Sequence, residues 1–236
     1  MKPNEILLNI MEDKIKEFEE VGDDHVGSSD FTPLRADAFK LSDEDKIKKI
    51  AESFAEIMDT LGLDLTDDSL SGTPYRVAKM YVKEVFSGLD AKNKPAAKLF
   101  KNKYNYDGMI VVRDIELQSH CEHHFVPIIG KVHVAYYPTD GNVIGLSKLN
   151  RIVRHFGKRP QVQERLNKQI LNELKEMLNT EDVAVVVDAF HFCVSTRGVK
   201  DTSSSTVTAM YRGKFKQNEI KDEFLRHVEN GSVLNK

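Results

Sequence analysis

The sequence predicts an α+β fold in which helices pack on a mainly antiparallel sheet. The chain has 236 residues, enough for one large domain, or one domain with an extension, to bury a core. Apolar residues at helical spacing dominate the first hundred residues, and β-branched and aromatic runs appear only after Met109. These later strands come in two pairs around helical segments, which favours antiparallel pairing.

The N-terminal region is expected to begin with an amphipathic helix at residues 4–20. Its apolar positions at helical spacing are Leu7, Met11, Ile15 and Phe18. Residues 22–39 mix Gly, Ser, Asp and Pro without a period, which predicts a linker or mobile arm.

Two further helices are expected before the first strand. Ser42 precedes three acidic residues and is a predicted N-cap, opening a helix that runs to about Leu61. In residues 73–89, Thr73 is the predicted N-cap, with Pro74 at the first helical position and Gly88 at the end.

The second half of the chain alternates paired strands with helices. In chain order we expect strands at 109–117 and 131–138, helices at 147–157 and 161–178, strands at 182–195 and 205–215, and a helix at 218–230. The expected organisation is therefore an N-terminal helix and flexible arm (1–40), a helical part (41–105) and an α+β catalytic domain (106–236).

Composition narrows the class of protein. Hydrophobic residues make up 40% and charged residues 30%, and no apolar run approaches the ~18–20 residues that span a membrane. The N-terminus lacks the uninterrupted apolar stretch of a signal peptide, so we expect a cytoplasmic protein without a membrane partner. The net charge of −3 argues against nucleic acid as a partner.

The segment "HCEHHF" (120–125) holds one of only two cysteines and three of the eight histidines. Cys121 and His124 have C-x-x-H spacing, which lets both side chains reach one metal ion. Cys193 lies in the predicted strand 182–195, where His191, two residues earlier, shares its face. Two cysteines and one histidine leave a fourth position open, as in catalytic zinc sites. The alternatives, a Cys121–Cys193 disulfide or a buried apolar Cys193, leave the histidines unexplained.

Residues 144–166 form a locally basic stretch in an acidic chain. Its six cations are Lys148, Arg151, Arg154, Lys158, Arg159 and Arg165, and Glu164 is its only acid. A helix that starts near Ser147 places Lys148 and Arg151 on one face, where they could bind an anionic ligand. The alternative is an ordinary solvated basic helix.

Five motifs together resemble the zinc-dependent GTP cyclohydrolase I family. They are "TPYRVAKMY", "CEHHF", "GLSKLNRI", "RPQVQERL" and "HFCVSTRGV", in family order between about residues 50 and 229. Residues 1–40 carry none of the resemblance, and no function is assigned to them.

The resemblance implies a role for each matching residue. It implies zinc ligands at Cys121, His124 and Cys193, and a catalytic acid–base pair at His123 and His191. Glu164 would hold the guanine, with Gln163 beside it, and Ser147 would lie near the ribose. The implied triphosphate-binding residues are Lys148, Arg151, Arg197 and Arg76. His120 falls outside the family pattern and is expected to be a bystander.

The resemblance also implies a reaction and an assembly. The reaction opens the imidazole ring of GTP at C8, releases formate and forms 7,8-dihydroneopterin triphosphate, the first step of folate or other pterin biosynthesis. The implied subunit fold is of the tunnelling-fold type, closing into a barrel in a decamer of two stacked pentamers with active sites between subunits. Two alternatives are another enzyme of this pterin- and deazaguanine-binding fold, and a non-catalytic module that binds zinc and guanine nucleotide.

Overall fold

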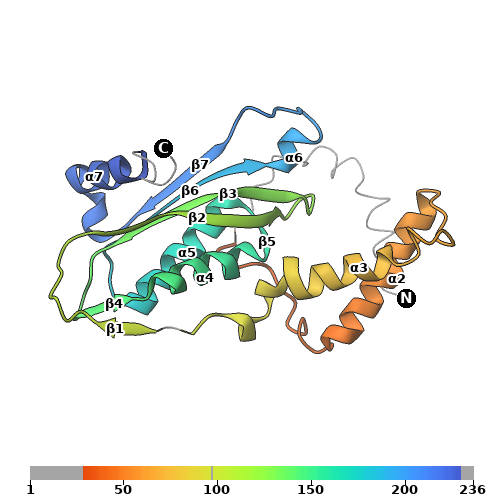
Figure 1. Cartoon of the computed structure of the whole chain (residues 1–236), viewed down its shortest axis with the longest axis horizontal. Coiled ribbons are helices and arrows are strands. Elements are labelled where there is room, and N and C mark those ends of the chain that lie inside the picture. The colour runs from red at the N-terminus through yellow and green to blue at the C-terminus, as the bar shows by residue number, and fades with distance from the viewer. Residues whose placement is uncertain (1–28, 97, 230–236) are drawn as a thin grey trace.

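The computed structural model describes residues 29–96 and 98–229 and confirms the α+β class (Figure 1). The predicted helix at 4–20 lies outside the described residues. Among the described helices, none is long and apolar enough to cross a membrane. A five-stranded sheet with helices on both faces forms one end of the molecule, and the N-terminal helices extend from the other end (Figure 1).

The first described helix, α2 (Asp43–Thr60), begins as the sequence predicts. The hydroxyl of Ser42 accepts a hydrogen bond from the Asp45 N–H at 3.1 Å, which satisfies one of the free donors of the first turn. The three acidic residues that follow favour the positive end of the helix dipole.

The predicted helix at 73–89 is broken into shorter pieces. It consists of α3 (Thr73–Met80), a π-helical turn (Tyr81–Val85) and 3-10 turns at Ser87–Leu89 and Ala91–Asn93. The N-cap prediction is wrong, because Gly72 holds the cap position and Thr73 is the first helical residue. The Thr73 hydroxyl instead accepts a hydrogen bond from Arg76 Nη2 at 2.8 Å.

The main sheet has the order β5-β2-β3-β6-β7. Its strands are β2 (Ile110–Cys121), β3 (Pro127–Tyr136), β5 (Pro160–Gln161), β6 (Val183–His191) and β7 (Thr206–Tyr211). All pairs are antiparallel except β2 with β5, and β1 (Leu99–Lys101) pairs with β4 (Asn142–Ile144) in a second small sheet. The four long strands were predicted; the three short ones were missed because two or three residues carry no readable period.

Helices cover both faces of this sheet. The helices α4 (Leu146–Gly157) and α5 (Gln163–Leu178) lie on one face, and α7 (Asn218–Glu229) lies on the other (Figure 1). Alternate residues of β6 therefore enter different cores: Val185 packs with α4 and α5, whereas Val186 packs with Phe215 and Phe224. Burial on both faces explains why β6 reads as a continuous apolar run.

The predicted strand 182–195 is wrong beyond His191. There the chain turns into the short helix α6 (Phe192–Ser195), so Cys193 lies in a helical turn and not in the strand. The physical reason is the lack of a partner: β6 pairs with β3 up to the Ile128–His191 register, and β3 begins only one residue earlier, at Pro127.

The helical N-terminal part is joined to α4 by close backbone contacts at Gly88. The Gly88 N–H donates to the Lys158 carbonyl at 2.9 Å, and Arg159 Nε donates to the Gly88 carbonyl at 2.8 Å. A Cβ atom on Gly88 would lie 2.0 Å from the His155 carbonyl oxygen, so only glycine fits. Burial, followed by the charge of Arg159, lowers the pKa of His155 to about 4.

The described end of the predicted arm is anchored on α5. Residues 29–41 contain neither helix nor strand. Arg165 Nε donates to the Ser29 carbonyl at 2.8 Å, and Gln169 Nε2 donates to the Asp30 carbonyl at 3.1 Å. Lys168 adds an ion pair to the Asp30 carboxylate at 2.6 Å.

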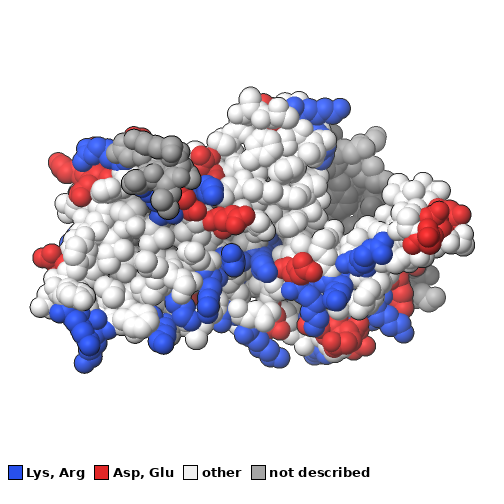
Figure 2. Space-filling view, viewed as in Figure 1, with Lys and Arg blue, Asp and Glu red and all other residues white. Residues whose placement is uncertain are grey.

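Charges are unevenly distributed on the face drawn in Figure 2. Side chains other than Lys, Arg, Asp and Glu cover most of the area over the sheet, whereas the helical N-terminal part carries both signs of charge. A sheet surface with few charges is typical of a contact area with another chain.

Candidate metal centre and active site

The hairpin loop between β2 and β3 (Glu122–Val126, here called the metal loop) carries the C-E-H-H-F motif. Two backbone bonds close it: Cys121 N–H to the Val126 carbonyl at 2.8 Å, and Phe125 N–H to the Cys121 carbonyl at 2.9 Å. Phe125 has φ of +53°, a left-handed conformation that side chains other than glycine adopt at a cost. This tight turn brings Cys121 and His124 to the same side of the loop.

Three predicted metal ligands converge at this loop. One ligand atom each from Cys121, His124 and Cys193 lies within 4.8 Å of the other two. The ligand atoms of a tetrahedral zinc ion are ~3.5–3.8 Å apart, given Zn–N and Zn–S bonds of ~2.0–2.3 Å. A small contraction would therefore suffice to bind the ion. Both cysteines are free in the structure, which contains no disulfide between them.

A cavity of about 250 Å³ lies next to this group of ligand atoms. It gathers seven of the residues that the sequence singled out: Cys121, His123, His124, Gln163, Glu164, His191 and Cys193. They come from the end of β2, the metal loop, the start of α5, the end of β6 and α6. Residues separated by up to 72 positions therefore share one concave site, which is the usual form of a small-molecule site.

The buried side chain of Gln163 holds His191 in a defined tautomer. Its amide nitrogen donates to the Val187 carbonyl at 3.1 Å and to the Thr206 carbonyl at 2.8 Å. This leaves its oxygen to accept from His191 Nε2 at 2.7 Å. His191 therefore carries its hydrogen on Nε2, and Nδ1 is the nitrogen free to accept a proton.

The two candidate acid–base histidines have different environments. Burial lowers the pKa of His191, and the nearby carboxylate of Glu164 partly opposes this shift. His123 is exposed, and its Nδ1 lies 3.7 Å from the Cys121 sulfur. His191 is thus held by a buried amide, whereas His123 is exposed and contacts Cys121.

A buried ion pair that sequence reasoning missed holds the metal loop against α5. Both terminal nitrogens of Arg165 bond the carboxylate of Glu122, one of them to Oε1 at 3.2 Å. The Arg165 side chain is only 3% exposed. In the sequence, Arg165 belongs to a basic stretch that could be solvated, and nothing there pairs it with an acid 43 residues away.

The predicted phosphate-binding residues, and the predicted ribose neighbour Ser147, lie apart from this cavity. Ser147, Lys148 and Arg151 belong to α4, and none of them lines the cavity. Arg76 also lies outside it and donates to the Ser69 carbonyl at 3.1 Å. Arg197 is exposed beyond α6 and does not line the cavity either. A single described chain therefore brings together the candidate metal ligands and the candidate guanine-binding residue, but not the cationic residues predicted to bind phosphate.

His120, which the family pattern leaves unassigned, packs away from the metal ligands. Its ring meets the edge of Phe86 with a centroid distance of 5.6 Å, and burial lowers its pKa. His120 does not line the metal cavity, and it is not one of the three candidate metal ligands.

Comparison with known proteins identifies the family. A family model described as "GTP cyclohydrolase I" matches residues 50–229, and the chain belongs to this family. A protein named GTP cyclohydrolase 1 from Flavobacterium johnsoniae is 55% identical over 89% of this chain and 94% of its own. Another of that name, from Pectobacterium carotovorum subsp. carotovorum, is 56% identical over 84% of this chain and 89% of its own.

One solved structure shows a distant likeness. The apo form of an archaeosine synthase QueF-Like superposes with a TM-score of 0.39 at 16% identity, covering 46% of this chain and 97% of that one. A likeness at this level carries no conclusion about the present chain.

Proposed function

We propose that this protein is a zinc-dependent GTP cyclohydrolase I, which hydrolyses GTP at C8 to formate and 7,8-dihydroneopterin triphosphate. Membership of the family supports the activity. The observation that carries the site assignment is the convergence of three metal-binding side chains, His191 and Glu164 on one cavity. The product is the starting point of folate and other pterins.

The metal would be held by Cys121, His124 and Cys193, a nitrogen and sulfur donor set that suits zinc. Three protein ligands leave one position for water or substrate. Zinc bound there supplies Lewis acidity, which makes water a competent nucleophile at neutral pH.

The histidines would carry the protons. The carbon between the two nitrogens of the guanine imidazole ring must become electrophilic before water attacks it, and protonation at N7 achieves this. His191 is suited to the role because Gln163 fixes its Nε2–H and leaves Nδ1 to hold and release the proton. We assign Gln163 to positioning His191, because its amide is already occupied by backbone and histidine partners.

Glu164 would select the base. Its side chain is exposed at the start of α5 and lines the same cavity as His191. A carboxylate can accept hydrogen bonds from both N1–H and the 2-amino group of guanine. Adenine lacks that pattern, so ATP would leave the carboxylate unpaired.

The triphosphate would be bound by cations of a neighbouring subunit. Lys148, Arg151, Arg197 and Arg76 lie outside the cavity of their own chain. Within the described chain, β7 is paired on one side only, and Val207 on it is 61% exposed. Pairing of such edges between subunits would close the sheet into the barrel of a tunnelling-fold decamer of two stacked pentamers. Ser147 would then lie near the ribose.

The activity is tested by incubating purified protein with GTP or ATP. We expect equal amounts of formate and, after oxidation, fluorescent pterin from GTP alone. Binding of GTP without formate release would indicate a non-catalytic module. A requirement for a nicotinamide cofactor would indicate a reductase of the related fold.

The shared site has its own test. Lys148→Ala and Cys193→Ser each remove a different half of the proposed site, so each variant alone should be inactive. Mixed decamers of the two variants should recover part of the activity, because some interfaces contain both intact halves. No recovery after subunit exchange would contradict a site built from two chains.

A further inference from the structure

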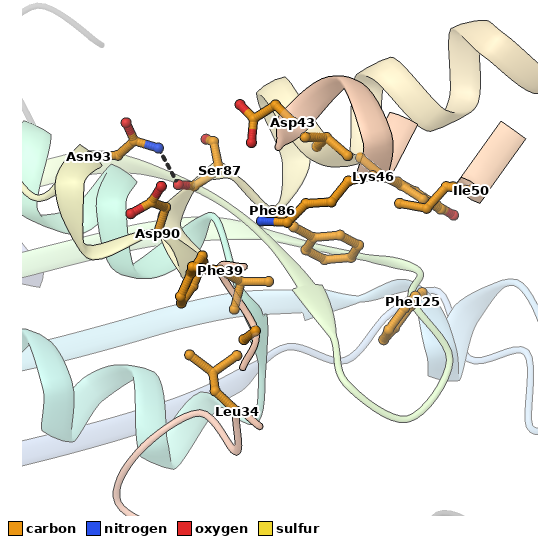
Figure 3. Close-up of a pocket in the computed structure, with 14 residues that line it drawn as sticks. Leu34, Phe39, Asp43, Lys46, Ile50, Phe86, Ser87, Asp90, Asn93 and Phe125 are labelled. Atoms are coloured by element: carbon orange, nitrogen blue, oxygen red, sulfur yellow. Dashed lines mark hydrogen bonds between the residues drawn. The ribbon is translucent and has the colours of Figure 1, made fainter. Parts of the chain in front are cut away.

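A second cavity of about 400 Å³ lies on the other side of the metal loop. Its walls come from the arm (Leu34, Phe39), from α2 (Lys46, Ile50), from Phe86 before the first 3-10 turn, and from Phe125 of the metal loop. Figure 3 shows these side chains converging from separate segments. No residue lines both this cavity and the metal cavity.

The walls are apolar and partly open to solvent. Leu34 is 48% exposed, Phe39 is 44% exposed and Phe125 is 47% exposed. Such side chains around a concavity of this size are typical of sites that bind a small organic molecule. The volume lies within the range of roughly 300–1,000 Å³ usual for such sites.

One cation in this cavity has no direct ion-pair partner within the described chain. Lys46 reaches from α2 into the cavity, and its Nζ lies 4.8 Å from the centre of the Phe39 ring (Figure 3). Among the described residues it forms no ion pair. The half-buried ammonium acts on the Asp43 carboxylate of the same cavity only through space, and that carboxylate is already bonded to Lys83.

The two acids at the cavity are already engaged. Asp43 is bonded to Lys83 at 2.6 Å, and that bond lowers the pKa of its carboxyl group. Asp90 accepts a hydrogen bond from the Lys92 N–H at 2.9 Å. The Asp90 carboxylate keeps its charge, because the N–H that it accepts is neutral. Lys46 is therefore the cation through which the cavity could pair with a ligand, and that ligand would be an anion.

Phe125 links this cavity to the metal loop. Its ring lies 5.1 Å from the ring of Phe86, while its backbone N–H closes the turn onto Cys121. His124, the neighbouring residue, is one of the three candidate metal ligands. A ligand that moves the Phe125 ring therefore acts on a left-handed residue in the turn that sets the spacing of Cys121 and His124.

We propose that this cavity is a second ligand site, which takes a small organic carboxylate with an aromatic body and transmits its occupancy to the metal loop through Phe125. The rings of Phe86 and Phe125 would contact the aromatic body, and Lys46 would pair with the carboxylate. The binding step stands independently of the proposed function, whereas the transmission to the metal site rests on it.

Binding is tested on the full assembled protein without GTP, with 1-naphthoate as a fluorescent probe and 1-naphthalenemethanol as its uncharged counterpart. We expect one naphthoate per chain, and Lys46→Gln should weaken its binding roughly two- to fivefold, as loss of one partly exposed ion pair does. Lys46→Gln should leave the alcohol unaffected. The matched control is Lys49→Gln, on the same helix but outside the cavity. This variant should change the binding of neither naphthoate nor the alcohol.

Three results would overturn the site: no saturable binding, equal weakening by Lys46→Gln and Lys49→Gln, or displacement of naphthoate by guanosine. Transmission is measured as a change in formate release and in the rate of zinc loss to a chelator when naphthoate saturates the protein. Formate release and the rate of zinc loss should both change in the native protein and in Lys49→Gln. At the same naphthoate concentration, both quantities should change less in Lys46→Gln. Binding without either change would overturn the link through Phe125.

Discussion

His191 donates its Nε2 hydrogen to the side-chain oxygen of Gln163 at 2.7 Å, while the Gln163 amide nitrogen is anchored on the carbonyls of Val187 and Thr206. The sheet itself thereby sets the orientation of a candidate catalytic ring. Glutamine is needed there because its amide both donates to the backbone and accepts from the histidine.

Gln163→Met should keep the buried volume but release His191. We expect turnover to fall roughly 10- to 100-fold, the usual effect of removing a partner that orients a functional side chain. Loss of the amide oxygen also removes an acceptor that favours the protonated ring, so the pKa of His191 should fall and the pH–rate profile should shift to lower pH.

The matched control for this variant is Gln161→Met. Gln161 is also buried at the metal cavity, but its amide nitrogen bonds the Phe156 carbonyl and Gln169. Both variants should lose stability, and only Gln163→Met should alter the pH profile of kcat/KM. Equal kinetic effects of the two changes would reduce Gln163 to a packing residue.

The ion pair between Glu122 and Arg165 should matter for stability. Arg165→Met leaves the Glu122 carboxylate, whose side chain is only 18% exposed, without its partner. We expect the free energy of unfolding to fall by roughly 3 kcal/mol, as for other broken buried pairs. Chemical denaturation at a fixed protein concentration measures this loss.

Lys168→Met is the matched control on the same helix. Its ion pair to Asp30 is solvent-exposed, with side chains 36% and 55% exposed, so its loss should cost at most ~1 kcal/mol. Similar losses in the two variants would mean that Arg165 does no more than fasten the arm.

Much of the fold follows from patterns that are local in the sequence. The four long strands and α2, α4, α5 and α7 have a clear apolar period. Ser42 is followed by three acidic residues, which is typical of the start of a helix. The errors fall where tertiary contacts decide. The predicted strand continued to residue 195 because apolar residues continue past His191, whereas β6 stops where its partner β3 begins.

Only part of the candidate site could be predicted from local sequence patterns. Cys121, His124 and Cys193 could be proposed because the chain has only two cysteines, because Cys121 and His124 have C-x-x-H spacing, and because the motifs around them resemble a zinc-dependent family. The roles of Gln163 and Arg165 depend on partners 28 and 43 residues away, and no spacing rule brings these together. The cavity behind Phe125 has no sequence signal, because its walls come from four separate segments.

Glu164→Gln tests the base-reading role. The substitution keeps the size of the side chain and one acceptor but removes the charge and the second acceptor. GTP binding should weaken by ~1.5–3 kcal/mol, the range for hydrogen bonds to a charged group, while zinc content stays the same. Glu176→Gln, an exposed acid on the same helix, should leave GTP affinity unchanged. GTP affinity unchanged in both variants would make Glu164 an ordinary surface acid.

The buried His155 predicts a pH dependence of stability. Its pKa is about 4 in the folded chain and 6.5 ordinarily, so the unfolded chain binds this proton first as the pH falls. The stabilisation that the neutral His155 contributes is complete above pH 6.5. It is lost progressively as the pH falls to about 4, and the total loss is about 3 kcal/mol. His155→Gln keeps an acceptor for Arg159 but does not titrate. The stability difference between the native protein and this variant should therefore change over that window, and a constant difference would contradict the assignment.

The central claim is that one zinc per chain, held by Cys121, His124 and Cys193, activates the hydrolysis of GTP. Its most direct test is to strip the protein of metal, titrate it with Zn²⁺, and follow bound zinc, formate and pterin in the same samples. We predict that formate and pterin appear together and reach their maximum at one zinc per chain. Cys193→Ser should bind little zinc and remain inactive, whereas Thr196→Ala, beside the same turn, should behave as the native protein does. Full activity of the metal-free protein, or full zinc binding by Cys193→Ser, would contradict the account.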